Sequence, residues 1–171
     1  MKNGLLLILT FILFSCSETK PLATVSAVDL NLYKGKWYEI ARLPQIFEKD
    51  CACVTAEYAL NEDNNIDVKN TCLDTTNQKI KVSEGEAFVL EGSQNAKLKV
   101  QFFWPFKGDY YIMDLDDDYR YALIGSPSRE YLWILSRTPS LPQSTIDQLT
   151  QKAIAEGYDT SSLIITKQNC D

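Results

Sequence analysis

The sequence predicts an all-β fold, either a sandwich or an up-and-down barrel, with one helix added near the C-terminus. Between residues 36 and 137, short apolar or aromatic runs alternate with turn-forming clusters. Their spacing of about 8 to 12 residues is typical of these two architectures. After residue 137 the apolar residues recur at helical spacing instead. A lone helix of this kind must lay its apolar stripe on the outside of the sheet.

Polar turn segments separate roughly eight or nine expected strands. The loop at residues 61–65 contains only Asn, Asp and Glu, most of which tolerate tight-turn backbone angles, so its flanking strands form a hairpin. The strands are expected at residues 36–42, 54–60, 66–70, 79–82, 84–90, 97–104, 109–115, 119–125 and 131–137, with a short last strand at 163–165.

The segment between the expected strands at 131–137 and 163–165 predicts one amphipathic helix of about 13 residues. Its apolar residues recur at helical spacing from Ile146 until Gly157. Ser140 or Ser144 is the expected N-cap, with Pro142 in the first turn. Together the strands and this helix form one domain, expected at residues 30–171, which is large enough to bury its own core.

Residues 1–15 predict a signal peptide, because one Lys precedes an uncharged apolar run. The run at residues 4–14 is shorter than the roughly 20 residues that span a bilayer as a helix. The sequence LFSC at residues 13–16 resembles a bacterial lipobox, which implies lipidation of Cys16. A plain signal peptide with an incidental Cys16 is the alternative. Residues 16–29 would then be the lipidated N-terminus and a polar tether.

The composition argues against several classes of function. The chain is acidic, with a formal net charge of −6, and it has no basic stripe or Gly-rich phosphate loop, so no nucleic-acid partner is expected. It contains no histidine, which excludes Ser–His and Cys–His nucleophilic catalysis. An acidic cluster at residues 114–118 leaves carboxylate catalysis open in principle, but a solvated surface turn is the ordinary outcome. We therefore expect no enzyme and no cofactor.

Assigning Cys16 to lipid leaves four cysteines, which is the number for two disulfides in an oxidising compartment. Cys51 and Cys53 are too close in sequence to pair comfortably with each other. One of them should join Cys72 and the other Cys170, and the residues alone do not decide which. A metal site is the competing interpretation, and the lack of histidine argues against it.

Three ordered motifs resemble the signatures of the lipocalin family. They are NLYKGKWYEIARLP at residues 31–44, LDDDYRYALIG at 115–125 and LWILSRTP at 132–139. The resemblance implies an eight-stranded up-and-down barrel with the helix packed outside. It further implies that Gly35 forms a sharp turn, that Trp37 plugs the closed end and that Arg137 packs across Trp37, which makes these three residues the barrel floor.

The details most resemble bacterial outer-membrane lipoprotein lipocalins and apolipoprotein D, in the runs YEIAR and PSREYLWILSRTP. That similarity favours Cys53 as the partner of Cys170. It also implies a protein anchored to the outer membrane of the cell envelope. Such a protein would bind a small hydrophobic ligand, such as a fatty acid or lysophospholipid, for lipid storage, transport or repair.

The expected ligand site is the barrel interior, because an eight-stranded barrel can hold one small ligand. The resemblance turns Arg137 inward, and side chains alternate faces along each strand. The opposite interpretation is a barrel filled by its own side chains, acting through its surface. The aromatic run at residues 102–106 cannot all face inward, so part of it would line the rim, touch membrane or form a homodimer interface. The expected ligand contacts are Ala56, Tyr58, Val68, Asn70, Val100, Phe102, Tyr131 and Trp133.

Overall fold

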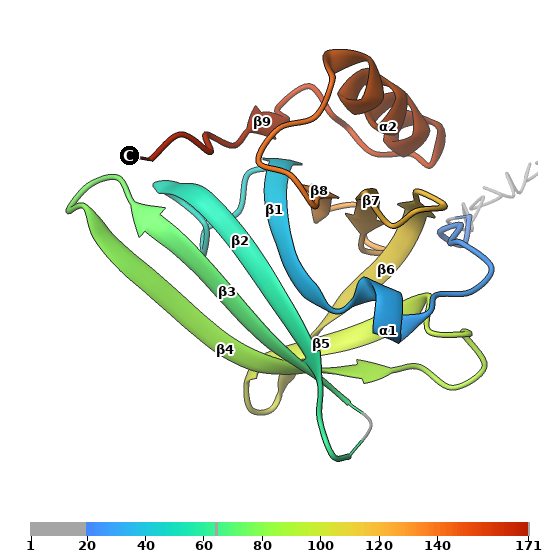
Figure 1. The fold of residues 1–171 in the computed structure, drawn as a ribbon. Coiled ribbons are helices and arrows are strands. Elements are labelled where there is room, and N and C mark those ends of the chain that lie inside the picture. Colours follow the sequence, from blue (N-terminus) through green and yellow to red (C-terminus); the bar gives the residue numbers. More distant parts are fainter. Residues whose placement is uncertain (1–19, 64, 171) are drawn as a thin grey trace, which may run out of the picture.

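A computed structural model describes residues 20–63 and 65–170 of the chain. The expected signal peptide and Cys16 lie outside the described residues. Figure 1 shows a curved antiparallel sheet with one longer helix beside it. The elements are α1 (Leu30–Tyr33), β1 (Gly35–Arg42), β2 (Cys51–Leu60), β3 (Ile66–Asp74), β4 (Lys79–Val89), β5 (Lys97–Phe103), β6 (Phe106–Leu115), β7 (Tyr121–Gly125), β8 (Leu132–Ser136), α2 (Gln143–Ala155) and β9 (Ile164–Ile165).

Strands β1 to β8 pair in sequence order, and β1 pairs with both β2 and β8, so the sheet closes on itself. This confirms the expected eight-stranded antiparallel barrel. Because the strands run up and down, the β1–β2, β3–β4, β5–β6 and β7–β8 loops share one end, which we call the open end. The other end carries α1 and the remaining loops, and we call it the closed end.

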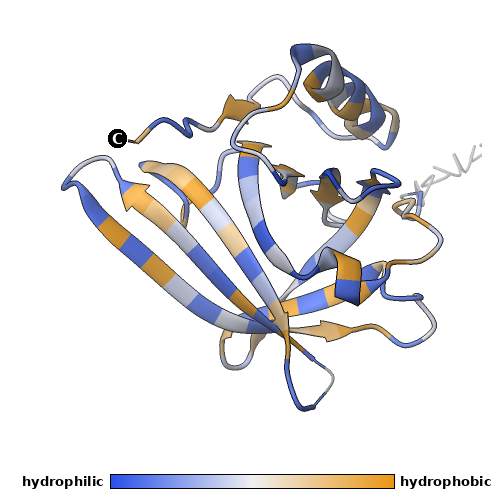
Figure 2. Ribbon diagram, in the orientation of Figure 1, coloured by the Kyte–Doolittle hydropathy of each residue, from blue (hydrophilic) through white to orange (hydrophobic). Residues whose placement is uncertain are grey.

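Alternating side chains produce two separate apolar cores. Figure 2 shows the alternation of hydrophilic and hydrophobic residues clearly along β4. The first core fills the barrel and includes Trp37, Val68 and Leu135. The second core lies between the sheet and α2, where Leu123 and Ile134 meet the helix. Both faces of the β1, β7 and β8 region are therefore buried, as expected where a helix covers a sheet.

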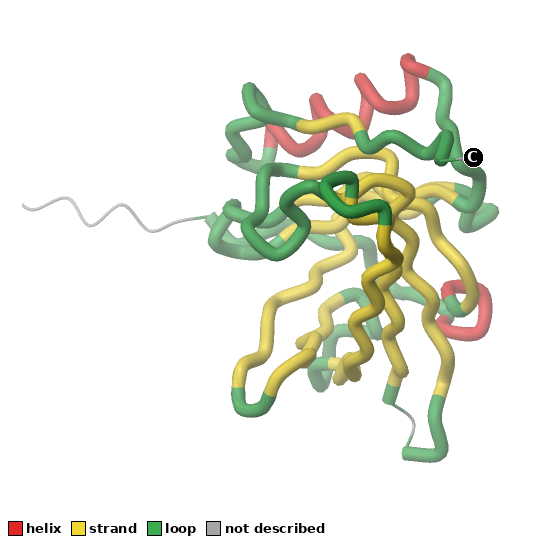
Figure 3. The backbone as a smooth tube through the Cα atoms, turned by 90° about the vertical axis from the view of Figure 1, so that its left-hand side faces the viewer, coloured by secondary structure: helices red, strands yellow, loops and turns green. Residues whose placement is uncertain are grey.

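Helix α2 lies outside the strands, as Figure 3 shows in red beside the yellow barrel. Its buried stripe consists of Ile146, Leu149 and Ala153. The expected N-cap was wrong: Pro142 occupies that position, without a side-chain hydrogen bond, and Ser144 lies inside the helix. The Pro142 carbonyl instead accepts the first hydrogen bonds of the helix, from the amides of Thr145 at 3.0 Å and Ile146 at 3.2 Å.

Two expected strands, at residues 79–82 and 84–90, form the single strand β4. Ser83, which was left between them, pairs directly with Asn70 of β3 and continues the ladder without interruption. A serine supplies no turn by itself when its backbone groups find partners on a neighbouring strand. The separation into two strands was therefore wrong. Counting residues 79–89 as one strand gives the eight strands of the barrel.

The chain before residue 30 packs on the barrel over the part that the structure describes. Leu22 and Val28 are buried, and the Val25 amide donates to the Ile112 carbonyl at 3.0 Å. Asp29 caps α1 through its side chain, which accepts a hydrogen bond from the Asn31 amide at 2.8 Å. Ordered contacts therefore begin about ten residues before the expected start of the domain. The small and polar composition of this segment is typical of a tether, so the sequence did not indicate that it packs.

The C-terminal segment fills the seam where β1 and β2 separate. Strand β9 pairs with the end of β1, and the Gln168 amide donates to the Glu39 carbonyl at 2.7 Å and the Val54 carbonyl at 2.9 Å. Disulfides join Cys51 to Cys72 and Cys53 to Cys170, with Cα atoms 5.5 Å and 6.2 Å apart. The second disulfide fastens the seam segment to β2. Within the described residues, no helix has the length and apolarity to cross a bilayer.

Candidate functional site

The closed end of the barrel is built around Trp37 and Arg137. Trp37 is fully buried, and its Nε1 donates to the Tyr33 carbonyl at 2.8 Å. The Arg137 guanidinium lies 3.9 Å from the centre of the Trp37 ring, at a distance where cation–π attraction is effective. Arg137 also donates to the carbonyls of Leu32 and Lys36 at 2.7 Å and 2.9 Å. These contacts join α1, β1 and the residue that follows β8 into a floor.

Gly35 is needed at the entry to β1 because its φ is +95°. A side chain at this φ would be strained, whereas glycine adopts such a backbone conformation readily. Its position beside the Arg137 guanidinium also completes the floor, since a Cβ at this residue would lie 3.6 Å from Nη1. The structure thus brings the three expected floor residues together.

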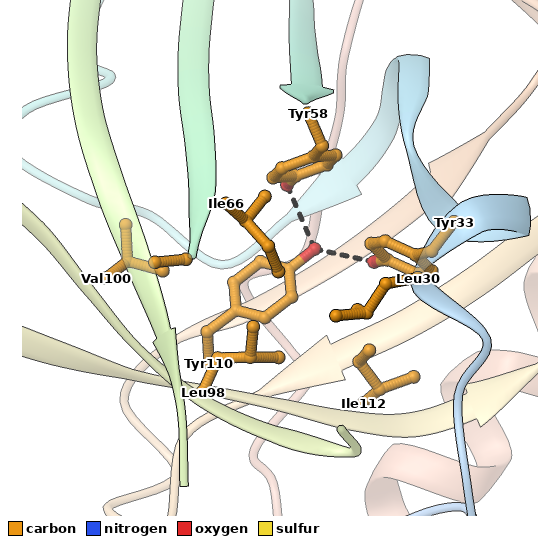
Figure 4. Close-up of a pocket in the computed structure, with 9 residues that line it drawn as sticks. Leu30, Tyr33, Tyr58, Ile66, Leu98, Val100, Tyr110 and Ile112 are labelled. Atoms are coloured by element: carbon orange, nitrogen blue, oxygen red, sulfur yellow. Dashed lines mark hydrogen bonds between the residues drawn. The ribbon is translucent and has the colours of Figure 1, made fainter. Parts of the chain in front are cut away.

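Three tyrosines fill the barrel above this floor. The Tyr110 hydroxyl lies between those of Tyr33 and Tyr58, at 2.7 Å and 3.0 Å (Figure 4). Burial raises the pKa of Tyr58 to about 12 and raises the pKa values of Tyr33 and Tyr110. All three hydroxyls therefore stay protonated at neutral pH and act as a neutral hydrogen-bonded cluster.

Little empty space remains beside the tyrosine cluster. The cavity there has about 10 Å³ open to the centre of a water-sized sphere. That volume suits a single water molecule at most. Apolar side chains, including Leu30, Ile66 and Ile112, form its other walls. Tyr33, Tyr58 and Tyr110 thus set the depth to which a ligand could enter without moving side chains.

The middle of the barrel holds most of the expected ligand contacts. Tyr58 and Val68 are buried in the interior core, and Ala56, Val100, Phe102 and Trp133 pack against it while remaining partly exposed. Side chains that face the interior and remain partly exposed must line a space that is open to solvent. Asn70 pairs with Ala56 of β2, and its Oδ1 atom is buried without a hydrogen-bond partner among the described residues.

Aromatic rings form a stack at the open end. Tyr131 lies just before β8 and stacks on Trp133 on one side and on Phe47 of the β1–β2 loop on the other. The ring centres are 6.1 Å apart in both pairs. Tyr131 is 38% exposed, so it lies at the rim of the barrel and not deep inside it.

A charged cluster of Glu39, Arg42 and Glu48 lies beside this stack. Arg42 pairs with Trp133 across β1 and β8, and Glu39 pairs with Leu135. Directly opposed residues share a face, so both charged side chains point to the interior. The Arg42 Nη1 atom lies 3.3 Å from Glu39 Oε1, and its Nε atom lies 3.3 Å from Glu48 Oε2. Trp133 Nε1 donates to the same Glu48 oxygen at 3.3 Å.

Burial dominates the titration of the two carboxyls in this cluster. Desolvation, together with the nearby charge of Glu48, raises the pKa of Glu39 to about 8, although a hydrogen bond from Thr166 and the charge of Arg42 oppose the rise. Desolvation also raises the pKa of Glu48, against a hydrogen bond from Trp133 and the charge of Arg42. One cation thus faces two carboxyls, and Glu39 keeps a proton near neutral pH.

We expect the stability of the native chain to fall between pH 6 and pH 8, and Glu39→Gln to remove most of this fall. An unfolded Glu39 loses its proton near its ordinary pKa of 4.5, whereas the folded one keeps it up to about 8. In this window the unfolded state binds fewer protons, so unfolding becomes more favourable by about 1.4 kcal/mol per pH unit. Urea titrations followed by circular dichroism at several pH values measure this slope.

No histidine titrates between pH 6 and pH 8 to alter this slope, because the chain contains none. The pKa values of Asp74 and Asp116 are lowered by Lys81 and Arg120, so both carboxyls stay ionised throughout. Asp116→Asn serves as the control, since it should leave the slope between pH 6 and pH 8 unchanged. An equal slope in the native chain and in Glu39→Gln would contradict the raised pKa of Glu39.

A signal for Glu39 was present in the sequence, because it shares the parity of Trp37 and therefore its face. No such signal existed for Arg42, whose parity is opposite. A register shift between Glu39 and Ala41 turns Arg42 inward. Glu48 comes from a loop, where no periodicity applies. Tyr110 shares the alternation of its strand, but its contact with Tyr33 depends on how the barrel closes.

Features that would suit other chemistry are weak among residues 20–63 and 65–170. No three His, Cys, Asp or Glu side chains in those ranges lie together in a way that could hold a metal ion. The acidic residues at 114–118 lie at the closed end, away from the open lumen. Asp116 is held there by two hydrogen bonds of 2.7 Å from Arg120, and Asp114 by Lys152 at 2.9 Å.

Comparison with known proteins gives several matches of nearly full length. Outer membrane lipoprotein Blc of Vibrio cholerae is 42% identical over 145 residues, covering 84% of this chain and 85% of that protein. Temperature-induced lipocalin-1 of Arabidopsis thaliana is 42% identical over 162 residues, covering 90% and 86%. Apolipoprotein D of Bos taurus is 37% identical over 152 residues, covering 83% and 78%.

Solved structures agree on the fold. Insecticyanin from the tobacco hornworm Manduca sexta superposes with a TM-score of 0.68 over 89% of this chain and 85% of that chain, at 22% identity. The family model described as a lipocalin-like domain matches residues 28–168, which contain the barrel, the outer helix and the seam segment. The chain is therefore a member of the lipocalin family.

Proposed function

We propose that this protein is a membrane-anchored carrier that binds one single-chain lipid, a fatty acid or a lysophospholipid, in its barrel. The observation that carries the proposal is the partly exposed apolar wall of Ala56, Val100, Phe102 and Trp133 inside the barrel. Solvent-accessible apolar surface in a concave site is the usual lining of a lipid pocket. The acyl chain would lie along this wall, with its end above the Tyr110 hydroxyl.

The polar end of the lipid would remain at the open end. Trp133, Tyr131 and the Arg42 cluster supply polar groups there, and Asn70, level with Ala56 in the middle of the barrel, adds an amide oxygen without a partner among the described residues. Single-chain lipids fit a lumen with polar groups near its entrance and an apolar wall farther in, because each buried methylene contributes about 0.8 kcal/mol. The protein would act by binding and release, in lipid storage, transport or repair, without catalysis.

The proposal includes export and lipidation of Cys16, which would hold the carrier at the outer membrane. Two relatives with a similar chain length carry the name outer membrane lipoprotein. Several acyl chains on one cysteine anchor a protein far more firmly than one chain does. Incorporation of labelled palmitate into the native chain, and its loss in Cys16→Ser, tests this part separately from ligand binding.

We expect Ala56→Trp to weaken lipid binding by at least about tenfold, because the indole would occupy the space of two or more ligand methylenes. The matched control is Glu57→Trp, since Glu57 is the next residue along β2 and is exposed on the outer face. Native mass spectrometry with oleic acid and with lysophosphatidylethanolamine gives both affinities. Equal binding by the two variants would place the lipid outside the barrel.

A filled barrel that acts through its surface is the second candidate, and the small cavity beside the tyrosines favours it. The same measurement separates the two. A native chain that binds neither lipid, and whose Trp133 fluorescence neither lipid changes, would support the surface role.

A further inference from the structure

Five large apolar side chains lie exposed on two loops of the barrel. Ile46 and Phe47 belong to the β1–β2 loop, and Phe103, Trp104 and Phe106 belong to the β5–β6 hairpin. Their exposed fractions are 95% and 64%, then 77%, 87% and 77%. We call this set the aromatic rim. Single exposed apolar residues are ordinary, but neighbouring ones mark an interaction site. Phe103 and Phe106 pair directly across the hairpin, with Trp104 between them in the chain.

Both loops of the aromatic rim belong to the open end, because the up-and-down order places alternate loops together. The rim therefore adjoins the entrance to the lumen. Phe102, the neighbour of Phe103, faces the interior, so the hairpin joins the lumen wall to the exposed rim within one residue. A partner surface that binds the aromatic rim would therefore lie directly opposite the entrance to the lumen.

The start of the described chain indicates what this rim meets. Lys20 lies against the β7–β8 loop, also at the open end: its carbonyl accepts a hydrogen bond from Arg129 Nη2 at 2.7 Å. Its Nζ atom pairs with Glu156 at 3.2 Å. The four residue steps from Lys20 back to Cys16 span at most about 14 Å. If Cys16 carries lipid, as the proposed function requires, the β7–β8 loop at the open end stays within this reach of the membrane surface.

We propose that the aromatic rim docks on the bilayer that holds the chain's own lipid anchor, with the open end of the barrel toward the lipid. Tryptophan and other aromatic side chains are enriched at membrane interfaces, where an apolar ring can enter lipid and a polar edge can stay wet. A tethered domain has a high local concentration at its surface, so weak rim contacts suffice for docking. Ligands then pass between bilayer and lumen without crossing bulk water.

Fluorescence of the acylated native chain in phosphatidylcholine vesicles with brominated acyl chains tests the docking. Trp37 is fully buried and Trp133 lies in the lumen, so Trp104 is the tryptophan that bilayer bromine should reach. We expect strong quenching in the native chain and its loss in Trp104→Phe. Equal quenching in both would overturn the proposal.

A second measurement removes the anchor and leaves the rim. A chain that begins at residue 16 with Cys16→Ser should sediment with phosphatidylcholine vesicles, and Phe103→Ser with Phe106→Ser should weaken this binding by about tenfold or more. The matched control is Leu32→Ser, because Leu32 is 56% exposed but lies on α1 at the closed end. A loss in Leu32→Ser equal to that in the rim variant would contradict a specific rim.

Two further outcomes keep this inference separate from the proposed function. The rim variant should keep lysophospholipid binding in vesicle-free solution, whereas Ala56→Trp should lose that binding and still sediment with vesicles. If the rim substitutions instead abolish self-association in sedimentation velocity and leave vesicle binding unchanged, the rim is an interface with a second copy and membrane docking is wrong.

Discussion

We expect Trp37→Ala to lower the free energy of unfolding by about 3–5 kcal/mol, the range for removing a large buried aromatic side chain. Trp37 is fully buried in the barrel floor. The substitution also leaves the Tyr33 carbonyl without its indole donor and leaves the Arg137 guanidinium without the ring beneath it. Urea unfolding followed by circular dichroism measures the loss.

Trp104→Ala is the matched control, because it deletes the same side chain at a position that is 87% exposed. Its effect on unfolding should stay within about 0.5 kcal/mol, as for most surface substitutions. Trp37→Phe should fall between the two, since it keeps a ring for Arg137 and loses the indole donor. Comparable losses for Trp37→Ala and Trp104→Ala would show that the floor contributes little to stability.

The second large effect concerns the Cys53–Cys170 disulfide, which closes a loop with a sequence separation of 117 residues. Replacing both cysteines by serine should cost about 5 kcal/mol, because the cross-link restricts the unfolded chain over most of its length. The Cys51–Cys72 disulfide has a separation of 21 residues, and its loss should cost about 3 kcal/mol. Urea unfolding of the two double variants without reductant gives both values.

The order of the two losses is the discriminating result. The longer loop should cost more, and it also releases the seam segment, in which Lys167 accepts a hydrogen bond from the Cys53 amide at 2.7 Å. A larger loss from removing Cys51–Cys72 would mean that local contacts at the open end outweigh loop closure. The native chain in reductant should match a chain that lacks both disulfides.

Much of the fold could be predicted from the sequence because its signals are local. Alternation along the strands, with its phase taken from the lipocalin resemblance, placed Ala56, Tyr58 and Val68 in the interior, and the helical spacing of Ile146 and its neighbours placed α2. The strand boundaries failed where a turn was inferred from composition alone. Ser83 continues β4 because a backbone partner on β3 was available, and composition does not record such partners.

The candidate site was only partly accessible to the same reasoning. Tyr131 was expected inside the lumen wall, and the structure places it at the rim in a stack with Phe47. The interior charge of Arg42 depends on a register shift in β1, which reverses the side-chain parity from which a sequence argument starts. Glu48 reaches the cluster from a loop, so its position follows from how the loop folds back.

By itself, the sequence determined the alternating strands, the outer helix and the number of cysteines available for disulfides, because each depends on residue type or local spacing. The floor residues Trp37 and Arg137 came from the resemblance of three motifs to the lipocalin signatures. Only the tertiary structure decided that Cys53 pairs with Cys170, that three tyrosines close the lumen and that one arginine faces two carboxyls. These features join residues far apart in the chain, and closure of the barrel is the physical event that brings them together.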